Sequence, residues 1–339
     1  MGKYIAKRIG YMLIVMVILS LLMYLVYAMI PFDRARTEAD KFKNTYRNDP
    51  EKFEQVYQNY RKELGLDQNV IVRYLGWIGV VPINGEYQGI LQGDFGYSYD
   101  YSRPAQEVLA EPMKNTIFIN IFATVLALGI TIPLGIFCAV HRGSKRDTAI
   151  QVATIIGYSI PIFITAILFI WLFAVQLKLL PVSGMKTPGS NYTGIAKILD
   201  ELKYMLLPLI VMTFSSLGGM TRYVRASMTE ALSMDCIRNA RAKGLREKVV
   251  VYSHAWRNAL IPIITLVIGW FIGIFSGSIM IENIFGLNGM GRIYINALSN
   301  KDFEVVLLLQ MFYVAVGLIG NLIIDIAYGL ADPRIRVNK

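Results

Sequence analysis

Long stretches without a charged residue or histidine restrict the fold of this chain more than any other feature. There are six such runs, of 22, 26, 30, 17, 24 and 20 residues: Ile9–Ile30, Asn115–Val140, Thr148–Leu177, Met205–Thr221, Asn258–Ile281 and Val305–Ile324. About 20 helical residues cross the roughly 30 Å hydrocarbon core of a bilayer. The apolar residues are continuous and do not alternate, which favours helices over barrel strands. The sequence therefore predicts an all-α membrane protein with six transmembrane helices.

Basic residues are unevenly divided between the segments that join these runs. With a cytoplasmic N-terminus, the internal segments carry 17 Lys and Arg in 66 residues, and the two short external ones carry 6 in 50. The internal segments are 1–8, 141–147, 222–257 and 325–339, and the external ones are 178–204 and 282–304. Cytoplasmic loops of membrane proteins are enriched in Lys and Arg, so we expect both termini in the cytoplasm. The net charge of +10 is explained in this way without a nucleic-acid partner.

The composition divides the chain into three predicted domains. Residues 1–30 form the N-terminal end and the first transmembrane helix, 31–114 form an external insertion, and 115–339 form the core with the other five helices. The insertion is almost neutral, with 11 basic and 13 acidic residues. Its aromatic residues recur at helical spacing between Arg34 and Gly65, which predicts one or two amphipathic helices. The insertion is therefore expected to be mainly helical.

The sequence lacks the motifs that several classes of enzyme and metal site require. The only Gly-Lys pair is Gly2-Lys3, which is not a nucleotide-binding loop, and no metalloprotease or serine-hydrolase motif is present. Two cysteines and two histidines do not make a disulfide framework or a zinc site. We expect no catalytic residue, no cofactor and no metal in this chain. Because the runs hold no charge for ion coupling, energy for uphill transport would have to come from another chain.

Small and polar residues mark positions inside the predicted spans. Gly269, Gly273 and Gly277 are four residues apart, and their common face favours close packing, either within this bundle or against a partner subunit. Pro161 is expected to kink the third span. Polar side chains such as Gln310 and Asn321 can form hydrogen bonds between helices or line a hydrated path, and the sequence leaves both roles open.

Residues 222–257 form the longest internal segment. Asp235 is expected to cap a short helix over Ile237–Lys243, and Gly244 to end it in the left-handed conformation. Arg238 and Arg241 are three residues apart and share one face. A short helix that forms a compact projection in this way could sit in a groove of a soluble partner. The alternative is a basic loop that only lies against anionic lipid.

The residues of this segment resemble the cytoplasmic signature of ABC importer permeases, and in particular the oligopeptide/dipeptide permease family. The matching stretches are Arg238-Asn239-Ala240-Arg241-Ala242-Lys243-Gly244-Leu245, His254 and Arg257-Asn258-Ala259-Leu260-Ile261-Pro262. Further matches, in chain order, are Gly65-Leu66-Asp67-Gln68, Gly93-Asp94-Phe95-Gly96, Ser159-Ile160-Pro161, Leu180-Pro181-Val182-Ser183-Gly184, Glu282-Asn283-Ile284-Phe285-Gly286, Gly289-Met290-Gly291 and Asp332-Pro333-Arg334-Ile335-Arg336. The resemblance covers nearly the whole chain, in the branch with a long first external loop.

Two positions depart from the general importer signature. Arg238 stands where the broad pattern has a glutamate, and Pro262 follows Gly244 by 18 residues instead of 13. The longer spacing is similar to that of the peptide-type permeases. Contacts that the broad family assigns to its glutamate cannot be transferred to Arg238.

The resemblance implies a type I ABC importer permease: a multi-pass subunit of a bacterial or archaeal cytoplasmic membrane, surrounded by lipid, that forms half of a path for oligopeptides or dipeptides. It implies four kinds of partner: a second homologous permease, two ATPase subunits that bind ATP and Mg, and an extracytoplasmic substrate-binding protein that meets residues 31–114 and Glu282–Arg292. Contact with the ATPase is expected from Asp235, Arg238, Asn239, Ala240, Arg241, Lys243, Gly244 and Leu245. Alternative cargoes are nickel chelates or oligosaccharides, and alternative classes are an ion-coupled carrier or a membrane enzyme.

Overall fold

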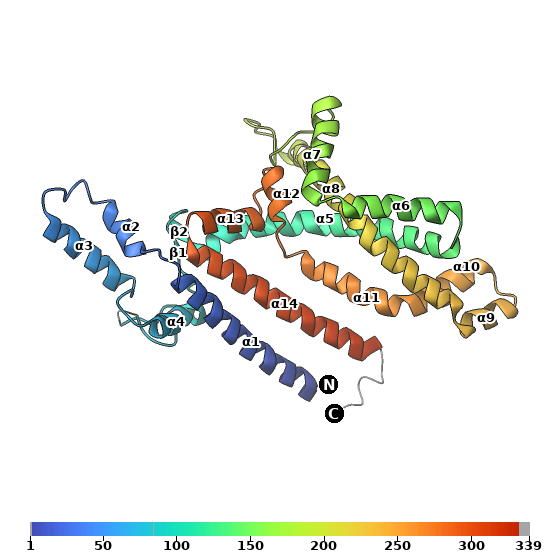
Figure 1. The fold of residues 1–339 in the computed structure, drawn as a ribbon, viewed down its shortest axis with the longest axis horizontal. Coiled ribbons are helices and arrows are strands. Elements are labelled where there is room, and N and C mark those ends of the chain that lie inside the picture. Colours follow the sequence, from blue (N-terminus) through green and yellow to red (C-terminus); the bar gives the residue numbers. More distant parts are fainter. Residues whose placement is uncertain (1, 84, 332–339) are drawn as a thin grey trace. The chain divides into compact units, whose positions relative to one another are not determined.

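The computed structural model describes residues 2–83 and 85–331, and their regular structure is almost entirely helical (Figure 1). The chain divides into two compact units. The first unit consists of Met1–Ala110 and Tyr294–Ala315, and the second of Glu111–Ile293 and Val316–Lys339. The last motif of the resemblance, at residues 332–336, lies outside the described residues.

The first unit contains one long helix followed by short elements. These are α1 (Gly2–Ala28), α2 (Arg34–Asp40), α3 (Pro50–Glu63), α4 (Val70–Ile78), the 3₁₀ turn η1 (Ile90–Gln92), β1 (Tyr97–Ser98) and β2 (Arg103–Pro104). The two strands pair antiparallel, with Tyr97 opposite Pro104. The unit also includes the start of α5, the end of α13 and the first half of α14.

Short polar side chains begin the three helices of the insertion. The Oδ1 atoms of Asp33, Asp49 and Asn69 accept hydrogen bonds of 3.1, 3.2 and 2.9 Å from backbone N–H groups in the first turns of α2, α3 and α4. Side chains of this kind satisfy N–H groups that have no partner within the helix. The helices α2 and α3 confirm the amphipathic helices predicted between Arg34 and Gly65.

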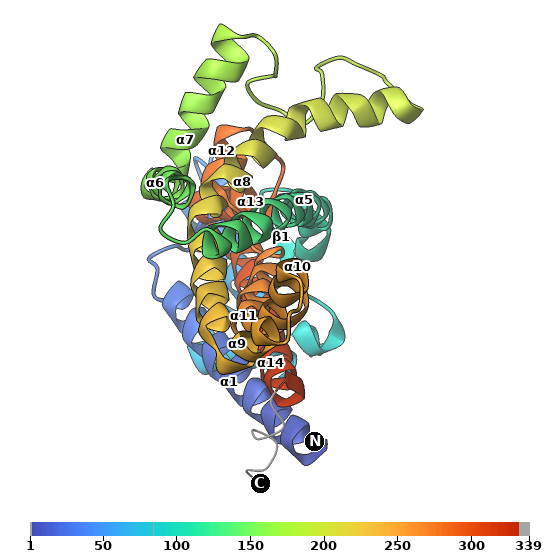
Figure 2. The ribbon, with the colours of Figure 1, turned by 90° about the vertical axis from the view of Figure 1, so that its right-hand side faces the viewer.

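The second unit carries the remaining helices. They are α5 (Ala105–Val140), α6 (Lys145–Ser159), α7 (Ile162–Phe169), the π-helix η2 (Ile170–Gln176), α8 (Gly194–Ser233), α9 (Asp235–Ala242), α10 (Glu247–Val249), the π-helix η3 (Val250–Ala255), α11 (Trp256–Gly273), α12 (Ile279–Ile284), α13 (Met290–Ser299) and α14 (Phe303–Ala331). Figure 2 shows α8 beside α11, with α9 at the end where the two helices are joined.

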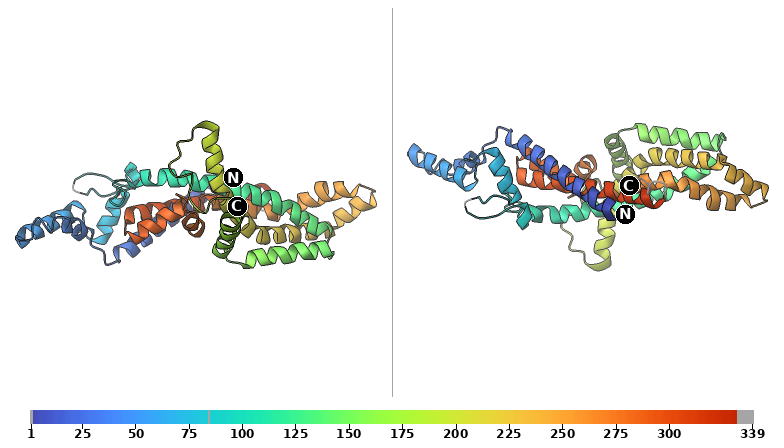
Figure 3. Two further views of the ribbon diagram at one scale, coloured as in Figure 1. Left: turned by 90° about the horizontal axis from the view of Figure 1, so that it is seen from above. Right: turned by 90° about the horizontal axis from the view of Figure 1, so that it is seen from below.

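Within the described residues, four helices are long and apolar enough to cross a membrane, and two bent pairs raise the number to six if each pair is one span. The four lie in Ile5–Ala28, Ala105–Val140, Gly194–Ser233 and Phe303–Ala327. This arrangement agrees with six predicted spans. The borderline run Met205–Thr221 belongs to α8, whose exposed first turns stand away from the other helices in Figure 3.

Two of the predicted spans are not the single helices that the runs indicated. The third breaks at Ile160 and Pro161, so that α6 meets the helix beginning at Ile162 at 99°. Proline restricts the residue before it to extended backbone, and Ile160 has φ −81° and ψ 123°. The fifth helix was predicted to continue to Ile281, but α11 ends at Gly273 and α12 begins only at Ile279. Polar side chains of α5 satisfy part of the backbone freed there.

Candidate functional site

The short helix α9 and the turn after it form a compact projection, here termed the α9 knob (residues 235–244). Its inner face is apolar: Ile237 and Ala240 are buried among residues of α8, η3 and α11. The helix begins earlier than predicted, because Met234 is its N-cap and Asp235 lies in the first turn, where its charge favours the helix dipole. Gly244 ends the knob with φ +73°, the left-handed conformation predicted for it.

The outer face of the α9 knob is polar. Arg238 has a side chain that is 78% exposed, and its Nη1 lies 3.5 Å from Oδ1 of the equally exposed Asp235. Asn239, Lys243 and Leu245 are also exposed. Surface ion pairs of this kind contribute little stability, so these side chains are available to a partner.

Arg241 has a different environment from Arg238. Its Nη2 and Nε donate to the two carboxylate oxygens of Glu247, at 2.6 and 3.1 Å, across the turn that joins α9 to α10. The Glu247 carboxylate raises the pKa of Arg241 above its ordinary value. A planar guanidinium that grips both oxygens fixes the geometry of the turn. The structure therefore gives Arg241 an internal partner, and Arg238 only a loose one.

A buried ion pair that the sequence analysis missed lies within the same unit. Nε and Nη2 of Arg225 on α8 both lie 2.8 Å from the carboxylate oxygens of Asp147 on α6. Asp147 also accepts from the backbone N–H of Gly143 and from the side chain of Gln151, both at 3.0 Å. Both charges stand just outside the apolar runs, so a search of those runs alone could not find them.

A second buried carboxylate organises the segment after α11. Glu282 is 4% exposed and accepts from the Thr116 hydroxyl at 3.0 Å and from the backbone N–H groups of Ser278 and Arg292, at 3.2 and 2.9 Å. Burial raises the pKa of Glu282, and these donors partly offset that effect. The carboxylate thus holds α12 and the start of α13 against α5.

The residues predicted for helix packing or for a hydrated path differ from one another in their surroundings. A Cβ on Gly269 or Gly273 would meet nothing within 4 Å in the part of the chain that the structure describes, whereas one on Gly277 would lie 2.3 Å from the backbone nitrogen of Gly291. Pro161 is the N-cap of α7. Gln310 donates to the hydroxyls of Tyr27 and Tyr294 at 2.8 and 2.9 Å. Asn321 is exposed on α14. The roles proposed for these residues stay predictions.

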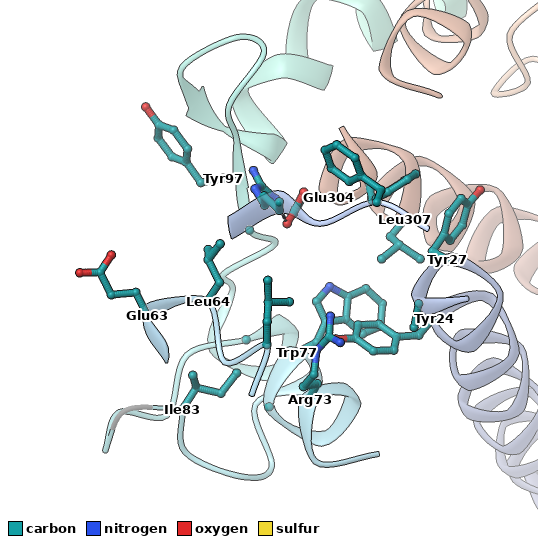
Figure 4. A pocket seen from close by; sticks show the side chains of 18 of the residues that line it. Tyr24, Tyr27, Glu63, Leu64, Arg73, Trp77, Ile83, Tyr97, Glu304 and Leu307 are labelled. Atoms are coloured by element: carbon teal, nitrogen blue, oxygen red, sulfur yellow. Dashed lines mark hydrogen bonds and ion pairs between the residues drawn. The ribbon is translucent and has the colours of Figure 1, made fainter. Parts of the chain in front are cut away.

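The first unit contains a cavity of about 780 Å³, here termed the aromatic cavity. It is lined by the end of α1, parts of the insertion and the start of α14. Figure 4 shows Glu304 and Leu307 on one side and Arg73, Trp77 and Tyr24 on the other. Arg34 pairs with Oε1 of Glu304, and its guanidinium lies 3.6 Å from the centre of the Tyr99 ring. Apart from the contact with a binding protein expected of the whole insertion, the sequence indicated no role for these residues.

Helices of spanning length, two broken spans and a short helix projecting between two long ones define a helical, multi-pass membrane protein. The chain belongs to the family of binding-protein-dependent transport system inner membrane components. The model of that family matches residues 131–337, and the model of its N-terminal part matches residues 1–120.

Named relatives cover the full length of the chain. It is 31% identical to the oligopeptide transport system permease protein AppB of Bacillus subtilis over 99% of both chains. It is 33% identical to the dipeptide transport system permease protein DppB of Escherichia coli K12 over 100% of both. An inward-facing structure of the MetNI methionine ABC transporter shares the fold, with a TM-score of 0.51 and 17% identity over 66% of this chain and 97% of that one. The architecture is thus that of a type I ABC importer permease.

Proposed function

We propose that this chain is the transmembrane subunit of an ATP-driven importer for oligopeptides or dipeptides. It forms half of the translocation path and pairs with a second homologous permease. The full-length similarity to relatives named oligopeptide and dipeptide permeases supports this cargo over nickel chelates or oligosaccharides. ATP and Mg are bound by two ATPase subunits, and this chain contributes no catalytic residue.

The α9 knob is the observation that carries the coupling to ATPase subunits. Its inner residues Ile237 and Ala240 are fixed in the core, and its outer residues Arg238 and Asn239 face outward. A helix held in this way moves with α8 and α11 as one body, because close-packed interiors transmit displacement. A push on the outer face is therefore passed to two long helices.

The direction of the chain in the membrane follows from the distribution of charge. The basic segments, including the α9 knob, lie in the cytoplasm together with both termini. The helical insertion and the Glu282–Arg292 segment then lie outside, where a substrate-binding protein delivers the peptide. Conformational change at the knob opens the path toward one side at a time.

Purification from native membranes through a tag on this chain tests the proposal. We expect a second permease and two nucleotide-binding subunits to co-purify, with vanadate-sensitive ATP hydrolysis. Addition of the purified binding protein loaded with tripeptide is expected to stimulate hydrolysis, whereas the same protein loaded with a nickel chelate or an oligosaccharide is not. Recovery of an intact chain without any ATPase would refute the importer assignment.

A further inference from the structure

The aromatic cavity of the first unit combines features that packing alone does not require. Its lining includes seven aromatic side chains, five carboxylates and three arginines. Its volume of about 780 Å³ falls within the roughly 300–1,000 Å³ typical of sites for small molecules. Carboxylates outnumber guanidinium groups, so the lining favours a ligand with a positively charged end.

Two polar atoms on opposite sides of the cavity are buried without a hydrogen-bond partner in the described part of the chain. One is Oε2 of Glu304, whose other oxygen is engaged by Arg34. The other is Nε of Arg73, and Arg73 forms no ion pair with any described residue. Buried polar groups are normally satisfied, so each unpaired atom needs an explanation. A ligand with an ammonium group for Glu304 and an anionic group for Arg73 would satisfy both.

The aromatic residues support the same ligand chemistry. Trp77 and Tyr24 lie beside Arg73, and Tyr27 lies toward the Glu304 side (Figure 4). The faces of aromatic rings attract cations, and a primary ammonium gains more from them when it is removed from water. Arg34 already uses the Tyr99 ring in this way. The cavity therefore offers both a carboxylate and aromatic faces to an ammonium group.

We infer that the aromatic cavity binds a zwitterion in which a primary ammonium group meets Glu304 and an anionic group meets Arg73. Two sources present this chemistry: a short unblocked peptide, and the phosphatidylethanolamine headgroup. The peptide source rests on the proposed function. The lipid source does not, so the two can be separated by experiment.

Trp77 provides a direct probe of occupancy. In a variant of the complete transporter subunit with Trp171, Trp256 and Trp270 replaced by Phe, Trp77 is the only tryptophan of this chain. The variant is placed in nanodiscs of phosphatidylcholine alone and titrated with trialanine, or reconstituted with increasing phosphatidylethanolamine. N-acetyl-trialanine amide and N-acetylated phosphatidylethanolamine are the matched ligands, since the first lacks both charges and the second lacks the ammonium group.

We expect a saturable change in Trp77 fluorescence with trialanine, with phosphatidylethanolamine, or with both. Blocking the ligand, or the substitution Glu304→Gln, should weaken binding about ten- to a hundred-fold, the effect of losing a charged hydrogen bond. Arg73→Gln should weaken it similarly, and Glu51→Gln on α3, outside the cavity, should not. Comparison of blocked with unblocked ligand on the unaltered cavity keeps the test independent of any variant that fails to fold.

A response to trialanine identifies the peptide source, and a response to phosphatidylethanolamine identifies the lipid source. Failure of Trp77 to respond to either zwitterion, or equal responses to blocked and unblocked ligands, would overturn the inference. Peptide-stimulated ATP hydrolysis measured on the same preparations reports on the proposed function separately. It can persist while the cavity is shown to bind nothing.

Discussion

The guanidinium of Arg225 on α8 grips the carboxylate of Asp147 at the start of α6 through two hydrogen bonds of 2.8 Å. The side chain of Asp147 is 1% exposed and that of Arg225 is 21% exposed. The pair joins the turn before α6 to the half of α8 that leads into the α9 knob. The ion pair therefore ties α6 to the part of α8 that precedes the α9 knob.

Removal of one charge from this pair should destabilise the second unit. Asp147→Asn leaves the guanidinium without its counter-charge, and breaking a buried pair costs about 3–5 kcal/mol. We expect a clearly lower Tm in detergent. The control is Glu230→Gln on α8, the helix of Arg225. Glu230 is exposed and forms no ion pair with a described residue. Equal melting of the two variants would contradict the importance given to the pair.

The two arginines of the α9 knob should respond differently to charge reversal. Arg241→Glu places two carboxylates at the turn to α10, and the double variant Arg241→Glu/Glu247→Arg restores the pair with its partners exchanged. We expect the double variant to regain most of the peptide-stimulated ATPase activity. Arg238→Glu should lower that activity about tenfold, equivalent to ~1.4 kcal/mol, with no effect on Tm. The prediction would be contradicted if the double variant regained no peptide-stimulated ATPase activity while Arg238→Glu kept full activity.

Gly269 and Gly277 belong to the same series of glycines spaced four residues apart, but substitution by alanine should affect them differently. Gly277→Ala puts a Cβ 2.3 Å from the nitrogen of Gly291, so backbone must shift, and we expect a destabilisation of about 1–3 kcal/mol. The added methyl group of Gly269→Ala meets nothing within 4 Å among the described residues. It should leave the isolated subunit unchanged. A fall in co-purification of the second permease with Gly269→Ala would identify that face as the subunit interface.

Glu282 should make the stability of the second unit depend on pH. Burial raises its pKa in the folded protein above the ordinary value of 4.5, so the folded state holds the proton more tightly than the unfolded state. The stabilisation is complete below pH 4.5 and is lost as the pH rises through the folded pKa. Glu282→Gln should abolish this contribution to the slope of Tm against pH above pH 4.5. Glu201, whose side chain is 42% exposed and lies 3.8 Å from Nζ of Lys197, provides a Gln control that should retain it.

Runs of apolar residues were sufficient to predict the helical membrane fold. Backbone N–H and C=O groups in the hydrocarbon core must be hydrogen-bonded within the protein, and continuous apolar runs achieve this as helices. Pro161 also marked the bend of the third run, because proline restricts the residue before it. No such residue marks the end of α11 at Gly273, where Asn120 of α5 donates to the carbonyls of Ile274 and Ser276. A partner from another helix has no trace in the local pattern.

Recognition of the α9 knob from sequence rested on local features, namely a short helix that Gly244 ends with φ +73°. The different surroundings of Arg238 and Arg241 could not be predicted in the same way. Both are basic and share a face, and only the fold brings Glu247 back to Arg241. The aromatic cavity was missed for a similar reason, since Arg73 and Glu304 are far apart in the chain and line one cavity only after folding.

The break between α11 and α12 leaves carbonyl groups that no helix satisfies. Asn120 of α5 is 8% exposed, and its Nδ2 donates to the carbonyls of Ile274 and Ser276 at 2.8 and 2.9 Å. One side-chain amide therefore satisfies two backbone acceptors. Non-helical backbone within a membrane protein persists only where protein groups satisfy it in this way.

Asn120→Leu keeps a side chain of similar size and removes both hydrogen bonds, which should destabilise the second unit by about 1–3 kcal/mol. Asn321→Leu makes the same substitution at an exposed position of α14 and should have little effect. Hydrogen exchange localises the change: amides of residues 279–285 should exchange faster in Asn120→Leu, because α12 loses the anchored segment before it. If exchange in α12 stayed as slow as in the control while Tm fell, the lost stability would have to come from another part of α5.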